Sequence, residues 1–178
     1  KTQQSRIFRG STEVKDGKFS IEFIVPKDIN YAIGRGKISY YAADVRQKPY
    51  RDASGMDTNV WIGGANLNAA ADNDAPKVTL FMNDEKFAFG GITNNDPILL
   101  VKLFDSSGIN TTGAGIGHDI TGILDNNLRL PINLNSYYRT EQGDFMSGRI
   151  NYPFYKLKDG RHTIKVKAWD VYNNPGEG

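Results

Sequence analysis

The sequence predicts an all-β protein, because short segments of alternating apolar and polar residues are separated by turn residues throughout the chain. The clearest segment, 161–169, follows the turn dipeptide Asp159-Gly160. One of its faces would carry His162, Ile164, Val166 and Ala168. This alternation is typical of an antiparallel strand with one buried face, so we expect the opposite face, with Lys165 and Lys167, to be solvated.

Composition limits the classes of function. The chain has 178 residues, of which 39% are hydrophobic and 24% charged, as in soluble globular proteins. Its net charge of +2 provides no broad positive field, so we expect no nucleic-acid partner. No apolar run approaches the ~18 residues of a membrane span, so we expect a chain that does not cross a membrane. The absence of cysteine excludes disulfides, a thiol nucleophile and thiolate metal ligands.

A segment rich in alanine, asparagine and aspartate, 66–76, predicts a boundary between two modules. Residues 1–70 would form a smaller N-terminal β module, which either packs on the second module or is the tail of a larger β-domain. Residues 74–178 contain about seven strand-like segments, the number typical of an immunoglobulin-like sandwich. The predicted fold is therefore an immunoglobulin-like antiparallel β-sandwich at the C-terminus, preceded by the smaller β module.

Individual strands follow from local patterns. Residues 19–25 come after the turn Asp16-Gly17 and alternate like a strand, so we expect them to pair with 12–15 as a hairpin. Residues 38–43 show the same alternation. The nearly continuous apolar run 98–104 is consistent with a strand buried on both faces or with the centre of a sandwich.

Four aspartates are candidate metal ligands. Asp72 and Asp74 lie in the predicted linker, and Asp105 and Asp170 lie at the ends of predicted strands. Calcium binds six to eight oxygen atoms, which closely spaced carboxylates and carbonyls can provide. Calcium is therefore the one cofactor that we weigh, although no dense Asp-x-Asp-x-Asp-Gly loop is present. The alternative is a solvated linker that binds no metal.

Catalytic signals are weak. The glycine-rich segment 113–117 precedes a predicted strand, whereas a phosphate loop requires a helix N-terminus behind it. His118-Asp119 could belong to a hydrolase triad, but the chain has no Gly-x-Ser-x-Gly elbow. His162 falls on the apolar face of its strand, where we expect a hydrogen-bonded core histidine. We predict no catalytic residue and no enzymatic activity for this chain alone; a hydrolase that uses His118 is a rival hypothesis.

Tyrosine and tryptophan are frequent. They are Tyr31, Tyr40, Tyr41, Tyr50, Trp61, Tyr137, Tyr138, Tyr152, Tyr155, Trp169 and Tyr172. We expect most of these rings to pack in the core or between modules, because large aromatic side chains are buried more often than displayed. If two or three coplanar rings were exposed on one face, the chain would instead be a carbohydrate-binding or adhesin-type surface module.

Several peptides, taken in order, carry a family resemblance. They are Gly17–Ser20, Val25–Tyr31, Gly36–Tyr41, Trp61–Gly64, Met82–Asp84, Gly90–Thr93, Ser107–Asn110, Gly115–Ile120 and Lys167–Asp170. In this order they resemble the C-terminal region of the gingipain-like cysteine peptidases that act as sortases of the type IX secretion system in Bacteroidetes. The resemblance spans nearly the whole chain.

The resemblance implies a parent protein on the cell surface, associated with the outer membrane of a Gram-negative bacterium. It also implies a peptidase domain in the same polypeptide that uses a cysteine and a histidine. Since this chain has no cysteine, no catalytic residue is carried over. The implied role is that of an accessory β-sandwich region. Its expected partners are the peptidase domain and, beyond it, secretion substrates or an outer-membrane shuttle protein.

Overall fold

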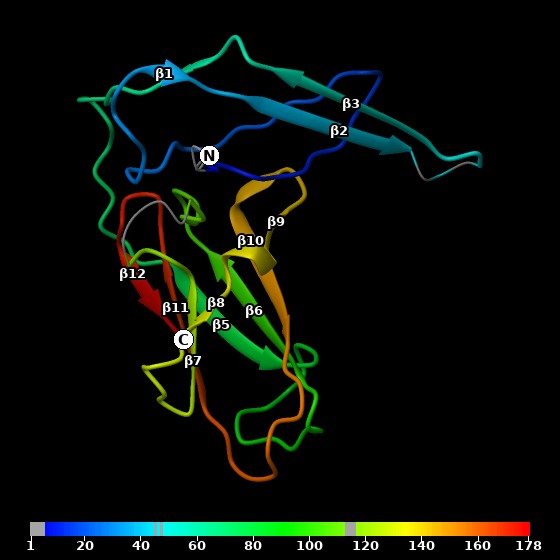
Figure 1. Cartoon of the computed structure of the whole chain (residues 1–178), viewed down its shortest axis with the longest axis vertical. Helices are drawn as coiled ribbons and strands as arrows, with labels where there is room; N and C mark the ends of the chain where they lie inside the picture. The colour runs from blue at the N-terminus through cyan, green and yellow to red at the C-terminus, as the bar shows by residue number, and fades with distance from the viewer. Residues whose placement is uncertain (1–5, 45, 47, 113–116) are drawn as a thin grey trace. The chain divides into compact units, whose positions relative to one another are not determined.

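The computed structural model describes residues 6–44, 46, 48–112 and 117–178, and these residues form an all-β structure (Figure 1). This confirms the predicted fold class. The strands are β1 (Gly34–Arg35), β2 (Ile38–Asp44), β3 (Arg51–Asp57), β4 (Trp61–Ile62), β5 (Lys77–Met82), β6 (Ile98–Phe104), β7 (Thr121–Leu124), β8 (Ile132–Asn133), β9 (Tyr138–Glu141), β10 (Asp144–Pro153), β11 (Ile164–Trp169) and β12 (Pro175–Glu177). The helical part that is described is one 3-10 turn, η1 (Asn135–Tyr137).

The chain divides into two compact units. The first contains Ala71–Gly178, Phe19–Ile29 and the described part of Lys1–Glu13, and the second contains Val14–Lys18 and Asn30–Ala70. Residues 19–29, which the sequence analysis assigned to the N-terminal module, thus group with the C-terminal one. The reason is long-range hydrogen bonding: the Lys27 amide, for example, donates to the carbonyl of Val171 at 2.9 Å.

The first unit is a β-sandwich of two four-stranded antiparallel sheets, with strand orders β5-β6-β10-β9 and β12-β11-β7-β8. Both sheets supply the hydrophobic core. The fully buried core residues are Leu99, Val101, Ile120, Leu134, Ile150, Val166 and Ala168. The immunoglobulin-like form of the sandwich stays a prediction.

Strand β6 lies between β5 and β10, at the centre of its sheet. Its inward residues Leu99, Val101 and Leu103 are at most 2% exposed, whereas Ile98 and Phe104 are 42% and 49% exposed. Of the two possibilities left open by the sequence, the sandwich centre is correct and burial on both faces is wrong. The run looks continuous because apolar residues also occupy part of its outer face.

Strand β11 shows the predicted alternation, since Val166 and Ala168 are buried and Lys165 is exposed. The prediction for His162 is wrong: this residue precedes the strand and is exposed. Its Nδ1 lies 2.8 Å from a carboxylate oxygen of Asp125, and its Nε2 lies 2.7 Å from the carbonyl of Lys158. Both neighbours are acceptors, and they raise the pKa of His162, the Lys158 carbonyl most and Asp125 next.

The turn at Asp16-Gly17 is present as predicted, with φ angles of 50° and 74° and a bridge between Lys15 and Lys18. The strand predicted for 19–25 is wrong, because these residues pair with no strand in the described part of the chain. Residues 38–43 do form a strand, β2, which pairs with β3.

No helix among the described residues has the length and hydropathy needed to cross a bilayer.

Candidate functional site

Three of the four predicted metal ligands meet at one end of the sandwich. Asp105 directly follows β6, Asp170 directly follows β11, and Asp72 lies in the segment that leads into β5. A bridge between Ile109 and Asp170 joins the two loops that follow β6 and β11. One carboxylate oxygen from each of Asp72, Asp105 and Asp170 lies within 4.8 Å of the others. Asp74 is exposed and does not belong to this group.

Asp170 organises the loop between β11 and β12. Its side chain is fully buried and accepts hydrogen bonds from the amides of Tyr172 (2.9 Å) and Asn174 (2.6 Å). The side-chain amide of Asn174 also donates to it at 2.7 Å and to the carbonyl of Asp72 at 3.1 Å. Asp170 therefore fixes both its own loop and the segment that carries Asp72.

Asp105 and Asp72 are linked through Ser107. The amide of Ser107 donates to Asp105 at 2.8 Å, and the hydroxyl of Ser107 donates to Asp72. Burial raises the pKa of Asp105 to about 6, and the negative charges of Asp170 and Asp72 act in the same direction. The pKa of Asp72 is lowered, first by the Ser107 hydroxyl and then by the amide of Asp74.

These carboxylates can bind a hard cation through oxygen atoms. A cation would offset the repulsion between three negative groups, two of which, Asp105 and Asp170, are at most 3% exposed. Calcium would require further oxygen ligands from carbonyls or water. The structure thus brings Asp72, Asp105 and Asp170 together, and calcium binding stays a prediction.

We expect Asp105→Asn to stabilise the metal-free protein at neutral pH. The pKa of Asp105 is about 6 in the folded chain against an ordinary value of 3.8. Ionisation of this buried carboxyl group therefore lowers the free energy of unfolding as pH rises from 4 to 6. Above pH 6 the variant should gain up to about 3 kcal/mol over the wild type, and below pH 4 the gain should vanish. Urea unfolding from pH 3.5 to 7.5 measures this difference. Asp74→Asn is the control, and a gain that does not depend on pH would contradict the assignment.

A second polar cluster, which the sequence analysis missed, surrounds Asp28. This carboxylate accepts hydrogen bonds from the side-chain amides of Asn110 (2.8 Å) and Asn173 (2.9 Å), and its oxygen lies 2.6 Å from Nδ1 of His118. Burial alone raises the pKa of Asp28, but the hydrogen bonds from His118, Asn110 and Asn173 outweigh it and leave the pKa below its ordinary value. The cluster joins the segment 19–29 to two loops of the sandwich.

His118 is thus oriented by Asp28 and not by Asp119, whose carboxylate accepts from the side-chain amide of Asn135 at 3.0 Å. The ring of His118 also lies against Trp169, with centroids 4.4 Å apart. This arrangement differs from the His118-Asp119 pair that a triad would have used. The glycine-rich segment 113–117 lies outside the described residues except for Gly117.

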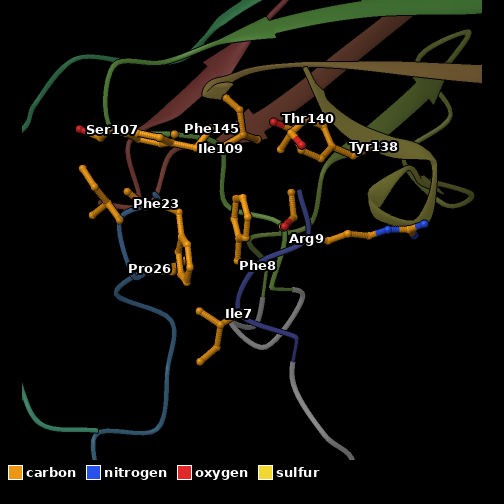
Figure 2. Close-up of a pocket in the computed structure, with 14 residues that line it drawn as sticks. Ile7, Phe8, Arg9, Phe23, Pro26, Ser107, Ile109, Tyr138, Thr140 and Phe145 are labelled. Atoms are coloured by element: carbon orange, nitrogen blue, oxygen red, sulfur yellow. The ribbon is translucent and has the colours of Figure 1, made fainter. Parts of the chain in front are cut away.

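A small pocket lies where the N-terminal segment meets the sandwich (Figure 2). The rings of Phe8 and Phe23 stack in parallel, 4.3 Å apart, and stand beside each other in Figure 2 below Ile109 and Phe145. The pocket volume is about 10 Å³, which is close to the space of one water molecule. Neither histidine lines it, so the pocket offers no substrate cleft next to an imidazole.

The aromatic prediction holds for only part of the set. Tyr138 is 6% exposed, and its ring lies against Gly148, where any Cβ atom would collide with it. The exposed members of the set are Tyr31, Tyr40, Tyr41, Tyr50, Trp61, Tyr137 and Tyr155. Five of these seven belong to the second unit, in which none of the described residues is buried.

Comparison with solved structures gives a match to the chain. No protein-family model and no curated protein matches the chain. A crystal structure of dimeric latent PorU from Porphyromonas gingivalis matches with a TM-score of 0.59 and 36% sequence identity, over 88% of this chain and 14% of the PorU chain. The resemblance noted in the sequence is therefore confirmed in both sequence and fold. The chain is a PorU-related region, and it spans about one seventh of the length of the PorU chain that it matches.

Proposed function

We propose that this chain is a non-catalytic accessory region of a PorU-like, gingipain-like surface cysteine peptidase of the type IX secretion system. The match to PorU at 36% identity over 88% of the chain carries this proposal. The catalytic cysteine and histidine of the parent would lie in the remaining part of the polypeptide, since these 178 residues include no cysteine. The chain would act at the cell surface, in association with the outer membrane.

The proposed role has two parts, which are to brace the peptidase domain and to present surface to secretion substrates or to an outer-membrane shuttle protein. A sandwich with a continuous core is suited to bracing, because its interior is closely packed and resists deformation. Its loop end is fixed by buried polar side chains such as Asp170 and Asn110, both fully buried. Loops that a rigid scaffold holds in place are common protein-binding surfaces.

A binding experiment tests the presenting role. The purified chain is titrated by calorimetry with the C-terminal domain of a type IX secretion substrate and, separately, with the outer-membrane shuttle protein. We expect one of them to bind with a Kd near 1 μM, which is about −8 kcal/mol and typical of a transient contact. An unrelated β-sandwich of similar net charge is the control. If neither protein binds, the presenting role is wrong and bracing alone remains.

The proposal includes calcium, which we expect Asp72, Asp105 and Asp170 to bind through their carboxylate oxygens. Millimolar calcium should raise the Tm of the wild type and of Asp74→Asn, and it should leave the Tm of Asp105→Asn nearly unchanged. At a calcium concentration of 100 times Kd the gain would be about 2.7 kcal/mol. Magnesium is the control cation. Equal shifts in both variants, or no shift in the wild type, would show that the three carboxylates do not bind calcium.

A carbohydrate-binding or adhesin-type surface module is the second candidate, and exposed aromatic rings favour it. Tyr41, Tyr50 and Trp61 are each more than 60% exposed, and the guanidinium of Arg35 lies 5.1 Å from the ring centroid of Trp61. Exposed rings can stack on the apolar faces of sugars. A glycan array distinguishes the candidates: hits that Trp61→Ala abolishes would support the carbohydrate role, and an array without hits would exclude it.

A further inference from the structure

The described residues of the second unit form no hydrophobic core of their own. Between residues 30 and 70, none of the residues that the structure describes is buried. Its largest element is the β2–β3 ribbon, whose seven pairs run from Ile38↔Asp57 to Asp44↔Arg51 (Figure 1). Neither strand pairs with a third strand in the described part of the chain. A two-stranded ribbon alone is marginally stable in water, because it buries too little apolar surface to offset the entropy of ordering the chain.

The two faces of the ribbon differ in chemistry. The Tyr40 face presents the cross-strand pairs Ile38/Asp57, Tyr40/Gly55, Ala42/Ala53 and Asp44/Arg51. Its charges lie at the two ends, so the two central pairs carry no charge, and Ile38 on this face is 41% exposed. The opposite face presents Ser39/Met56, Tyr41/Ser54 and Ala43/Asp52, and the hydroxyl of Tyr41 donates to the carboxylate of Asp52 at 3.2 Å. The centre of the Tyr40 face is thus suited to an apolar layer, whereas the polar side chains of Ser39, Ser54 and Asp52 are spread over the opposite face.

A segment of the first unit shows the same deficit independently. Phe19, Ile21 and Phe23 alternate with the period of a strand, yet they are 38–49% exposed and belong to no strand. A sequence with a strand pattern and exposed apolar residues is typical of a sheet from which neighbouring strands are missing. Both units therefore contain a segment with a strand pattern and exposed apolar residues to which the described residues add no further strand, although the ring of Phe23 stacks on that of Phe8.

The length of the related protein indicates where such partners come from. This chain matches 14% of the PorU chain, so a PorU-like parent has most of its residues outside the 178. We propose that the β2–β3 ribbon is part of a larger sheet whose other strands come from the parent polypeptide outside these residues. Those strands pair with an outer edge of the ribbon, and an apolar layer of the same domain covers the Tyr40 face. This inference rests on the proposed function, because it assumes a PorU-like parent.

Hydrogen exchange followed by mass spectrometry tests the proposal. Exchange is measured for peptides that cover β2 and β3, once in the isolated 178-residue chain and once in the full parent protein. In the parent we expect the amides of β2 and β3 to exchange about a hundredfold more slowly than in the isolated chain. The amides of β6 and β10, in the core of the sandwich, serve as the internal reference and should be protected in both.

Two variants of the parent test which face is covered. Ala42→Asp places a charge at the centre of the Tyr40 face, and Ser39→Asp places the same charge on the opposite face of the same strand. We expect Ala42→Asp to remove the added protection of β2 and β3, and Ser39→Asp to retain it. In the isolated chain neither variant should change exchange at β6 and β10, which shows that the sandwich still folds.

The possible outcomes separate the hypotheses. Equal protection of the ribbon in both proteins would overturn the proposal, because the ribbon would then be stable alone. Lack of protection in both would also overturn it, while leaving the accessory role of the sandwich intact. The isolated chain could also gain protection of the ribbon at high protein concentration, together with a rise in the apparent molecular mass in solution. This result would show that the ribbon pairs with a second copy of the chain, and it would equally overturn the proposal.

Discussion

Leu103→Ala should lower the free energy of unfolding by about 3 kcal/mol, whereas Phe104→Ala should change it by less than about 1 kcal/mol. The two residues are neighbours on β6, but Leu103 is 2% exposed and Phe104 is 49% exposed. Truncating Leu103 leaves a cavity among core side chains of both sheets, while truncating Phe104 removes a ring that is half in water. Urea denaturation of the isolated chain measures both values.

This pair of variants tests the alternation on which the fold prediction rests. If Phe104→Ala were as costly as Leu103→Ala, β6 would be buried on both faces and the outer face of its sheet would need a cover. If neither were costly, the sandwich would not be the stable part of the isolated chain. Unchanged m-values are required, because they show that both variants unfold from an equally compact state.

Asp170→Ala should be the most destabilising change at the loop end, with a loss of about 4 kcal/mol. The fully buried carboxylate accepts three hydrogen bonds, from the amide of Tyr172 and from the backbone and side chain of Asn174. Without it, these part-buried donors lose their acceptor, and we expect the loop between β11 and β12 to lose its order. Thermal unfolding followed by circular dichroism measures the effect.

Asp170→Asn separates hydrogen bonding from charge at the same position. The asparagine can still accept from the two backbone amides, and it removes one of the negative charges near Asp105. We therefore expect Asp170→Asn to cost less than half as much as Asp170→Ala. Equal losses in the two variants would mean that the negative charge, and not the acceptor geometry, stabilises the loop.

The local features of the fold could be predicted from sequence, because they depend on neighbouring residues. The strand at 164–169 follows from period-two alternation, and the turn at Asp16-Gly17 follows from residues that tolerate positive φ. Asp72, Asp105 and Asp170 could be proposed as candidate ligands because Asp105 and Asp170 lie at the ends of predicted strands and Asp72 lies in the acidic predicted linker. Asp74 differs from them only in its position along the loop, which a sequence pattern does not resolve.

Features that depend on distant pairing could not be predicted in this way. The partners of Asp28 lie 82, 90 and 145 positions away in the chain, and no local pattern connects them. The alternation of 19–25 was recognised, but a strand also requires a neighbour to pair with, which the described part of the chain does not supply. The exposure of Tyr41 and Trp61 could not be predicted for the same reason, since burial depends on distant packing and none of the described residues between 30 and 70 is buried.

The central proposal is that this chain supports a peptidase domain and takes no part in its chemistry. The most direct test is to delete the 178 residues of this chain from the PorU-like parent and measure its Tm together with its kcat/KM on a short peptide. We predict a Tm lower by several degrees, with kcat/KM unchanged within about threefold at a temperature where the shortened protein is folded. An unchanged Tm with a loss of kcat/KM of about a hundredfold would contradict the claim, because groups of this chain would then act in the reaction itself.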